Sequence, residues 1–226
     1  MVTNIDRLRA ARPGLLLIEL ALIVATFVFD DYIPLSKTPV LFAIAWMSMW
    51  LRGVTWRSVG FTLPAGWMRL AVIGLIAGVA MWCLEFFVES PLLRQITGEL
   101  PDLHVFDDVV GNLKYLLIIL GLNIVLAAFG EEMVWRGYAL PRVAGLIGES
   151  RNSWIAALVL VNVAFGLAHL YQGLSGVVEA GFAGFLLGLL YLGTGRNLIA
   201  PMVAHWISNN IEFVLIYFGL HPGVGS

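Results

Sequence analysis

Four ionisable side chains lie within strongly apolar stretches of this sequence, where charge is costly: Glu131, Glu132, His169 and His205. Ionisable groups inside membrane-spanning helices are rare, and they usually face a cavity or a partner. A single histidine in such a helix is more often a hydrogen-bonding partner for a neighbouring helix than a catalytic group. Two histidines, two acids and the amide of Asn209, spread over three apolar stretches, instead favour a functional site.

Helical spacing separates the two acids. Neighbouring residues of a helix point about 100° apart, so Glu131 and Glu132 cannot share one task. Glu132 and Arg136 are four residues apart and face each other, which predicts an ion pair that holds the helix in place. Glu131 remains beside Gly130, which leaves room for a reactant to approach. We therefore interpret Glu131 as a candidate general base and Glu132 as a structural residue.

The remaining polar residues predict hydrolysis by water. His205 and Asn209 are one helical turn apart and present N–H donors that can bind the oxyanion formed when water attacks an amide carbonyl. His169 shares a helix face with Phe165, four residues earlier, and can help to hold the water that Glu131 deprotonates. No Ser, Cys or Asp stands at a spacing typical of a covalent nucleophile. The sequence thus favours direct attack by water and predicts no cofactor.

Three alternatives use the same residues. Glu131, His169 and His205 could bind Zn²⁺ with a water as fourth ligand, although the sequence contains no HExxH motif. Intramembrane Glu and His also mark proton relays in transporters, but the chain shows no inverted repeat. A third alternative is a non-cleaving bacteriocin-immunity or scaffold membrane protein that binds a peptide.

The same residues resemble the motifs of the CAAX-protease and bacteriocin-processing family (CPBP, or Abi), which comprises intramembrane glutamic endopeptidases. The family pattern is EExxxR, FxxxH and HxxxN, and the matches are Glu131-Glu132 with Arg136, Phe165 with His169, and His205 with Asn209. Each motif alone is weak, but their order within one apolar stretch is specific. The resemblance covers roughly residues 113–215.

This resemblance implies a conical helical bundle whose cavity opens to the membrane. It implies that Glu131 and His169 activate water, and that His205 and Asn209 form the oxyanion hole. Glu132, Arg136 and Phe165 would support the motifs. The substrates would be membrane-associated or secreted peptides or proteins. Eukaryotic members of the family trim prenylated C-terminal tails, but nothing in this sequence indicates prenylated substrates.

The composition requires lipid as part of the solvent. Of 226 residues, 60% are hydrophobic and 12% charged, against about 45–50% and about 25% in soluble domains. The predicted fold class is therefore an all-α polytopic bundle, a single integral membrane domain over residues 1–226 with a catalytic core at 113–215. The expected location is the plasma (cell inner) membrane. The net charge of −2 and the absence of a basic run indicate no nucleic-acid partner.

A bilayer-spanning helix needs about 20 mostly apolar residues. By that length we predict seven spans, near residues 14–33, 39–52, 67–88, 113–138, 153–170, 174–193 and 198–218. An eighth is expected if the region around Pro201 forms two pieces. The first span could be a signal peptide, but a retained helix is favoured because apolar segments continue along the chain. The loop 89–111 could hold a short amphipathic helix.

Basic residues predict the orientation of these spans, because cytoplasmic loops carry an excess of Lys and Arg. With the N-terminus inside, the inside segments hold ten: Arg7, Arg9, Arg12, Arg52, Arg57, Arg69, Arg136, Arg142, Arg151 and Arg196. The outside segments hold three, Lys37, Arg94 and Lys114. An N-in, C-out topology follows. Small residues recur along two spans, at Gly74 and Gly78 and at Gly181, Gly184 and Gly188, and predict close helix packing.

Overall fold

The computed structural model describes residues 13–33, 36–148 and 150–224, and this part of the chain is all-helical without strands. The α-helices are α2 (Pro13–Val28), α3 (Thr38–Leu51), α4 (Trp67–Leu84), α5 (Ser90–Thr97), α6 (Leu113–Leu122), α7 (Leu140–Ile147), α8 (Arg151–Leu167), α9 (Gly173–Gly193) and α10 (Ile199–Tyr217). Wider π-helical turns form η3 (Glu85–Glu89), η5 (Asn123–Glu131) and η6 (Met133–Ala139). Short 3-10 turns form η1 (Asp30–Tyr32), η2 (Trp56–Val59), η4 (His104–Val109) and η7 (Leu170–Gln172).

Each of the seven predicted segments contains a helix. Within the described residues, three helical runs are long and apolar enough to cross a membrane: Trp67–Thr97, Leu113–Ile147 and Leu170–Gly193. Three further apolar helices are shorter, namely Pro13–Val28, Thr38–Leu51 and Arg151–Leu167. The chain is thus an all-helical integral membrane protein, whereas the number of seven spans stays a prediction.

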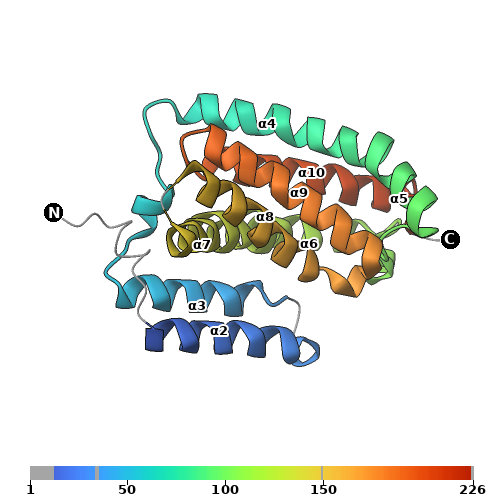
Figure 1. Ribbon diagram of the computed structural model, residues 1–226. Coiled ribbons are helices and arrows are strands. Elements are labelled where there is room, and N and C mark those ends of the chain that lie inside the picture. The colour runs from blue at the N-terminus through green and yellow to red at the C-terminus, as the bar shows by residue number, and fades with distance from the viewer. Residues whose placement is uncertain (1–12, 34–35, 149, 225–226) are drawn as a thin grey trace.

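The helices run back and forth between two ends of the bundle (Figure 1). The described residues of connections 29–37, 98–112 and 168–172 gather at one end, which we call the acidic end. Those of connections 52–66, 148–150 and 194–198 gather at the other, which we call the arginine end. Backbone hydrogen bonds join connections within each end, from Asp102 to Gln172 at the acidic end and from Leu198 to Gly60 at the arginine end.

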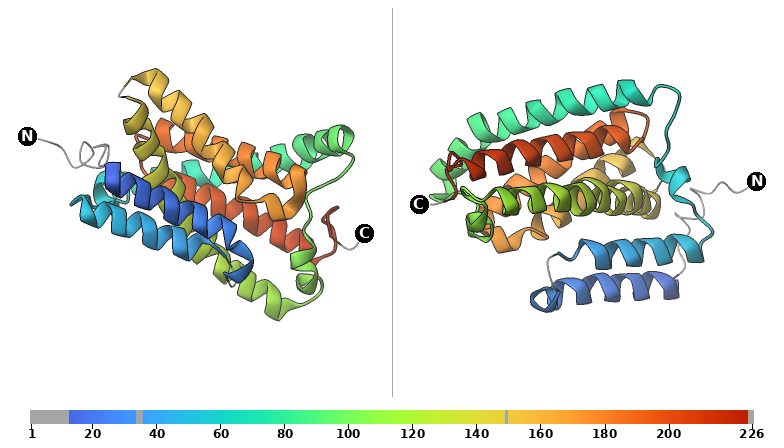
Figure 2. Two further views of the ribbon diagram at one scale, coloured as in Figure 1. Left: turned by 60° about the horizontal axis from the view of Figure 1, so that its bottom comes forward. Right: turned by 180° about the vertical axis from the view of Figure 1, so that it is seen from behind.

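Helices α4 and α10 lie side by side along the bundle in the front and rear views (Figures 1 and 2). Their backbones approach closely at the predicted small residues. A Cβ atom added to Gly74 would lie 2.5 Å from the carbonyl oxygen of Ala200, and one added to Gly78 would lie 2.6 Å from that of Ala204. Both glycines are therefore needed for the close contact. The contact at Gly78 involves Ala204, the residue that precedes His205 on α10.

The second predicted small-residue stripe packs α9 against α8. An added Cβ at Gly184 would meet the side chains of Phe165 and Asn162 at 2.6 and 2.7 Å, and one at Gly188 would meet Leu158 at 2.4 Å. The glycines of α9 thus make space for side chains of α8 that carry the FxxxH pattern. The prediction that these residues form packing surfaces is confirmed for both stripes.

The helical run that carries Glu131 is longer than the sequence predicted. It continues to Ile147 instead of ending near residue 138, and Pro141 lies within the run where the π-helical η6 passes into α7. Glu131 therefore lies sixteen residues before Ile147, the last residue of its helical run. His169 lies the same number of residues after Ser153, which is near the start of α8. The longer helix brings the two residues to a similar depth in the bundle.

Two further differences concern helix ends. The predicted span 153–170 placed His169 within a helix. Helix α8 ends at Leu167, so His169 lies two residues beyond the end of that helix. The loop 89–111 contains the short helix α5, as expected, followed by η4. Helix α2 and helix α3 pack together along one side of the bundle (Figure 2) and share a buried polar cluster, in which Glu19 accepts hydrogen bonds from Ser48 and Arg52.

Candidate active site

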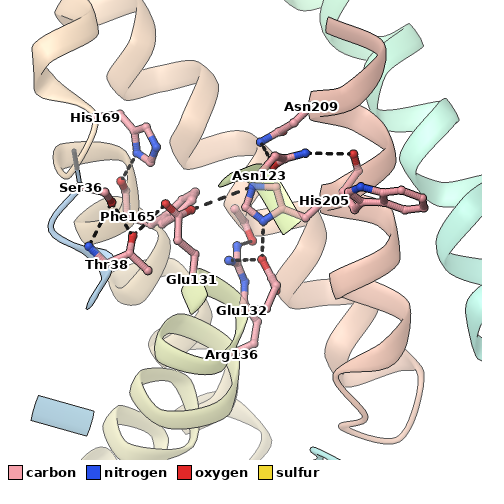
Figure 3. A network of polar contacts seen from close by, with 12 residues as sticks. Ser36, Thr38, Asn123, Glu131, Glu132, Arg136, Phe165, His169, His205 and Asn209 are labelled. Carbon is pink, nitrogen blue, oxygen red and sulfur yellow. Dashed lines mark hydrogen bonds and ion pairs between the residues drawn. The ribbon is translucent and has the colours of Figure 1, made fainter. Parts of the chain in front are cut away.

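The structure brings the four predicted catalytic residues to one cavity of about 230 Å³. Glu131 comes from the end of η5, His169 from the turn after α8, and His205 and Asn209 from one face of α10. Their side chains converge from three directions in Figure 3. Residues separated by up to 78 positions in the sequence therefore share one solvent-accessible space within the membrane-protein core.

The predicted ion pair of Glu132 with Arg136 forms and is fully buried. Arg136 Nη1 donates to Glu132 Oε1 at 2.8 Å. The other guanidinium nitrogen donates to the backbone oxygen of Gly184 at 2.7 Å and to Asn162 at 3.3 Å. The guanidinium also lies over the ring of Phe165, 4.9 Å from its centroid. Arg136 therefore ties η6 to both α8 and α9.

Glu132 has a second partner that the spacing did not reveal. His205 Nδ1 lies 2.8 Å from Glu132 Oε1, the same oxygen that binds Arg136. The other carboxylate oxygen is buried without a hydrogen-bond partner in the described part of the chain. Because Glu132 holds Nδ1, the ring of His205 presents Nε2 towards Glu131, whose Oε2 lies 4.0 Å away. Glu132 therefore both anchors the helix and orients His205.

Glu131 faces the cavity, with 17% of its side chain exposed. Thr38 Oγ1, at the start of α3, donates a hydrogen bond to Glu131 Oε1 at 3.3 Å. The expectation that Gly130 leaves room for a reactant is wrong, because a Cβ added there would lie 2.7 Å from Cγ2 of Thr38. This glycine admits the N-terminus of α3, and α3 in turn positions the carboxylate.

His169 is held by the residue that the FxxxH pattern pairs with it. Its Nδ1 lies 2.9 Å from the backbone oxygen of Phe165, so Nδ1 carries the proton and Nε2 is left as an acceptor. The two rings meet edge to face at 4.8 Å. The imidazole is thus fixed in the tautomer that can accept a hydrogen bond from water in the cavity.

Asn209 is positioned by Asn123, a residue that the sequence analysis did not single out. Asn209 Nδ2 donates to Asn123 Oδ1 at 3.2 Å (Figure 3). Asn123 Nδ2 in turn donates to Asn210 Oδ1 at 2.7 Å. An amide nitrogen has two N–H groups, so Asn209 keeps one for a ligand. The available signal was an isolated buried amide in an apolar stretch, eight residues before Glu131.

Glu85, Glu179 and His221, which lie at or near the cavity, were also missed. Glu85, Glu179 and Glu212 line it together with the four predicted residues. His221, beyond the end of α10, lies 3.4 Å from Glu212, and burial lowers the pKa of this imidazole. Among the described residues, no three His, Cys, Asp or Glu side chains lie close enough together to hold a metal ion.

A second cavity of about 280 Å³ adjoins the first one and shares Glu131 and His169 with it. Both residues, together with Phe165, line the two cavities. The second cavity is also lined by Lys37, which forms an ion pair with Asp30 and donates to the backbone oxygen of Ala168 at 3.0 Å. Glu131 and His169 therefore stand between two chambers.

Comparison with known families gives a match over the core of the chain. Residues 113–211 are similar to the family model described as type II CAAX prenyl endopeptidase Rce1-like. This similarity favours a protease among the alternatives. The family resemblance stated from the motifs is thereby confirmed, and the Rce1-like segment contains all four predicted catalytic residues. No curated protein and no solved structure gives a match to the chain.

Proposed function

We propose that the protein is an intramembrane glutamic endopeptidase that hydrolyses peptide bonds of membrane-associated or secreted peptides. One observation carries the proposal: Glu131 and His169 stand between two chambers, and His205 and Asn209 face the same space from α10. An extended peptide that occupies both chambers would place a backbone carbonyl between these groups. The similarity of residues 113–211 to a CAAX endopeptidase family supports a protease.

In the proposed reaction, Glu131 takes a proton from water while Nε2 of His169 accepts the other water hydrogen in a hydrogen bond. The water oxygen bonds to the carbonyl carbon of the peptide, and the carbonyl oxygen becomes an oxyanion. Breaking of the C–N bond then releases a carboxylic acid and an amine, and the proton held by Glu131 passes to the leaving nitrogen. No covalent enzyme intermediate is required.

The oxyanion would be bound by Nε2 of His205 and Nδ2 of Asn209. Because Nδ1 of His205 is engaged by Glu132, the ring donates from Nε2 only when both nitrogens carry protons. The carboxylate of Glu132, which binds Nδ1, offsets that positive charge while Glu131 holds the proton taken from water. Donors aimed at a developing oxyanion inside a site of low dielectric are among the largest contributions to catalysis.

Replacing Glu131 by Gln tests the proposal. We expect cleavage to fall roughly 10²–10⁴-fold, the usual contribution of a general base, while the protein stays folded in detergent. The measurement is mass spectrometry of membrane peptides incubated with the purified chain. Glu179→Gln is the matched control, because Glu179 lines the same cavity without a place in the reaction. Wild-type rates in Glu131→Gln would contradict the mechanism.

Chelators separate this mechanism from the zinc alternative. The proposed reaction needs no metal, so the wild-type rate should be unchanged after prolonged treatment with a strong zinc chelator. Loss of activity that added Zn²⁺ restores would instead assign Glu131, His169 and His205 to a metal. If the wild-type chain binds peptides but cleaves none, the non-cleaving immunity or scaffold alternative holds.

We propose seven spans with the N-terminus inside the cell and location in the plasma (cell inner) membrane. The alternation of connections between the two ends of the bundle supports this number, since α2 begins at the arginine end and α10 finishes at the acidic end (Figure 1).

A further inference from the structure

Both chambers of the candidate active site lie towards the acidic end of the bundle. The connections of this end contribute Lys37, Phe106 and Tyr171 to the chamber walls. None of the described residues that line the two chambers belongs to connections 52–66, 148–150 or 194–198 at the arginine end. The chambers therefore lie nearer the connections of the acidic end, and packed helices separate them from the arginine end.

The packing of the arginine end agrees with this direction. Leu140, Ala144, Ala157 and Leu198 are almost fully buried in one hydrophobic cluster. Tyr191 closes the same region, because its hydroxyl donates to the backbone oxygen of Val59 at 3.0 Å. This cluster lies between the chambers and the connections of the arginine end, so it blocks a route to the site from that side.

The exposed basic residues indicate which end faces the cytoplasm. Four exposed arginines lie at the arginine end: Arg57, Arg69, Arg151 and Arg196. The sequence before α2 adds Arg7, Arg9 and Arg12. At the acidic end, Arg94 and Lys114 are exposed, while the charge of Lys37 is paired with Asp30. Since Lys and Arg near the ends of spans set the orientation, the arginine end faces the cytoplasm.

We propose that the active site opens to the extracytoplasmic side of the membrane, so that its substrates are peptide segments that have already been carried across. This inference rests on the proposed function. With this opening, the substrates would be secreted or membrane-anchored peptides whose scissile bond lies outside the cell. Cytoplasmic C-terminal tails, including prenylated ones, could not reach the chambers.

The orientation can be measured without any activity. In a Cys83→Ser background, which removes the one native cysteine, Asp108→Cys places a thiol at the acidic end and Thr55→Cys places one at the arginine end. Both positions are exposed. A membrane-impermeant maleimide should label the Asp108→Cys variant in intact cells, and the Thr55→Cys variant only after permeabilisation. The reverse pattern would overturn the proposal.

A second measurement tests where cleavage occurs. A randomised ten-residue library is fused to a single membrane anchor, on its outer side in one set and on its inner side in the other. Wild-type cells should cut members of the outer set only, and Glu131→Gln cells should cut neither. Cleavage of the inner set alone would contradict the extracytoplasmic opening of the site but would still support the peptidase activity. If neither set is cleaved and the maleimide labelling is as expected, the proposed peptidase activity is contradicted and the proposed orientation is supported.

Discussion

A single carboxylate oxygen of Glu132 binds two partners that belong to different parts of the protein. Oε1 accepts from Arg136 on the same helical run and from His205 on α10. Spacing predicted the first contact, because residues four apart on a helix face each other whatever surrounds them. It could not predict the second contact, since no local rule relates positions 73 residues apart. The same holds for Asn123 and Asn209, which lie 86 residues apart.

This shared oxygen predicts two separable effects of Glu132→Gln. Loss of the charge leaves Arg136 buried without its counter-ion, which should lower the free energy of unfolding by about 3–5 kcal/mol. His205 also loses its charged acceptor, so kcat should fall more than KM rises. Chemical denaturation in detergent measures the first effect, and steady-state cleavage measures the second.

A double variant distinguishes the two effects of that substitution. Glu132→Gln combined with Arg136→Met removes both buried charges, so stability should recover in part. Cleavage should stay low, because His205 still lacks the carboxylate. If the double variant regains the wild-type rate, Glu132 has only the structural task that its helical spacing suggested.

At the scale of elements, the sequence located the helices well and their ends less well. Mean apolarity over about 20 residues marks a helix in lipid, and each of the seven segments contains one. The extension of Glu131's helix to Ile147 was missed because Arg142 and Pro141 interrupt the apolar pattern, although Arg142 is buried in the structure. The π-helical turns of η5 and η6 have no distinctive composition that could have predicted them.

The contact between α4 and α10 gives a prediction at this scale. In Gly78→Ala the new Cβ would lie 2.6 Å from a backbone oxygen of α10, so the helices must separate, at a cost of about 1–3 kcal/mol. Because Ala204 precedes His205, kcat should fall as well. Gly121→Ala is the control, since nothing lies within 4 Å of its added Cβ, and its thermal midpoint should be unchanged or higher. Equal midpoints for both variants would contradict the role of Gly78.

At the scale of the whole molecule, charge is separated between the two ends of the bundle although the net charge is only −2. Exposed acids gather on the connection beside the chambers, at Glu99, Asp102, Asp107 and Asp108. Exposed arginines gather at the opposite end. Composition alone could not show this separation. The distribution of basic residues over the predicted spans had already indicated one half of it, with ten Lys and Arg inside and three outside.

This separation predicts a salt effect on substrate capture. The acidic end should attract peptides with lysines near the cleaved bond, and salt screens such attraction because the Debye length falls from about 10 Å at 0.1 M to about 3 Å at 1 M. Raising salt over this range should lower kcat/KM for a lysine-flanked peptide several-fold. The same peptide with glutamine flanks should change little. Equal salt dependence of the two peptides would show that the acidic end does not guide substrates.

The two chambers that share Glu131 and His169 also bear on how a turnover finishes. In the proposed reaction the new carboxylate and the new amine would belong to fragments in different chambers, with the carboxylate formed beside Glu131. Each product fragment would prevent a new substrate peptide from binding, but the two fragments would occupy different chambers. Both products should therefore be competitive inhibitors, and both should be able to bind at the same time. Electrostatic repulsion between Glu131 and the new carboxylate should also make the acid fragment leave first, so that the products are released in a fixed order.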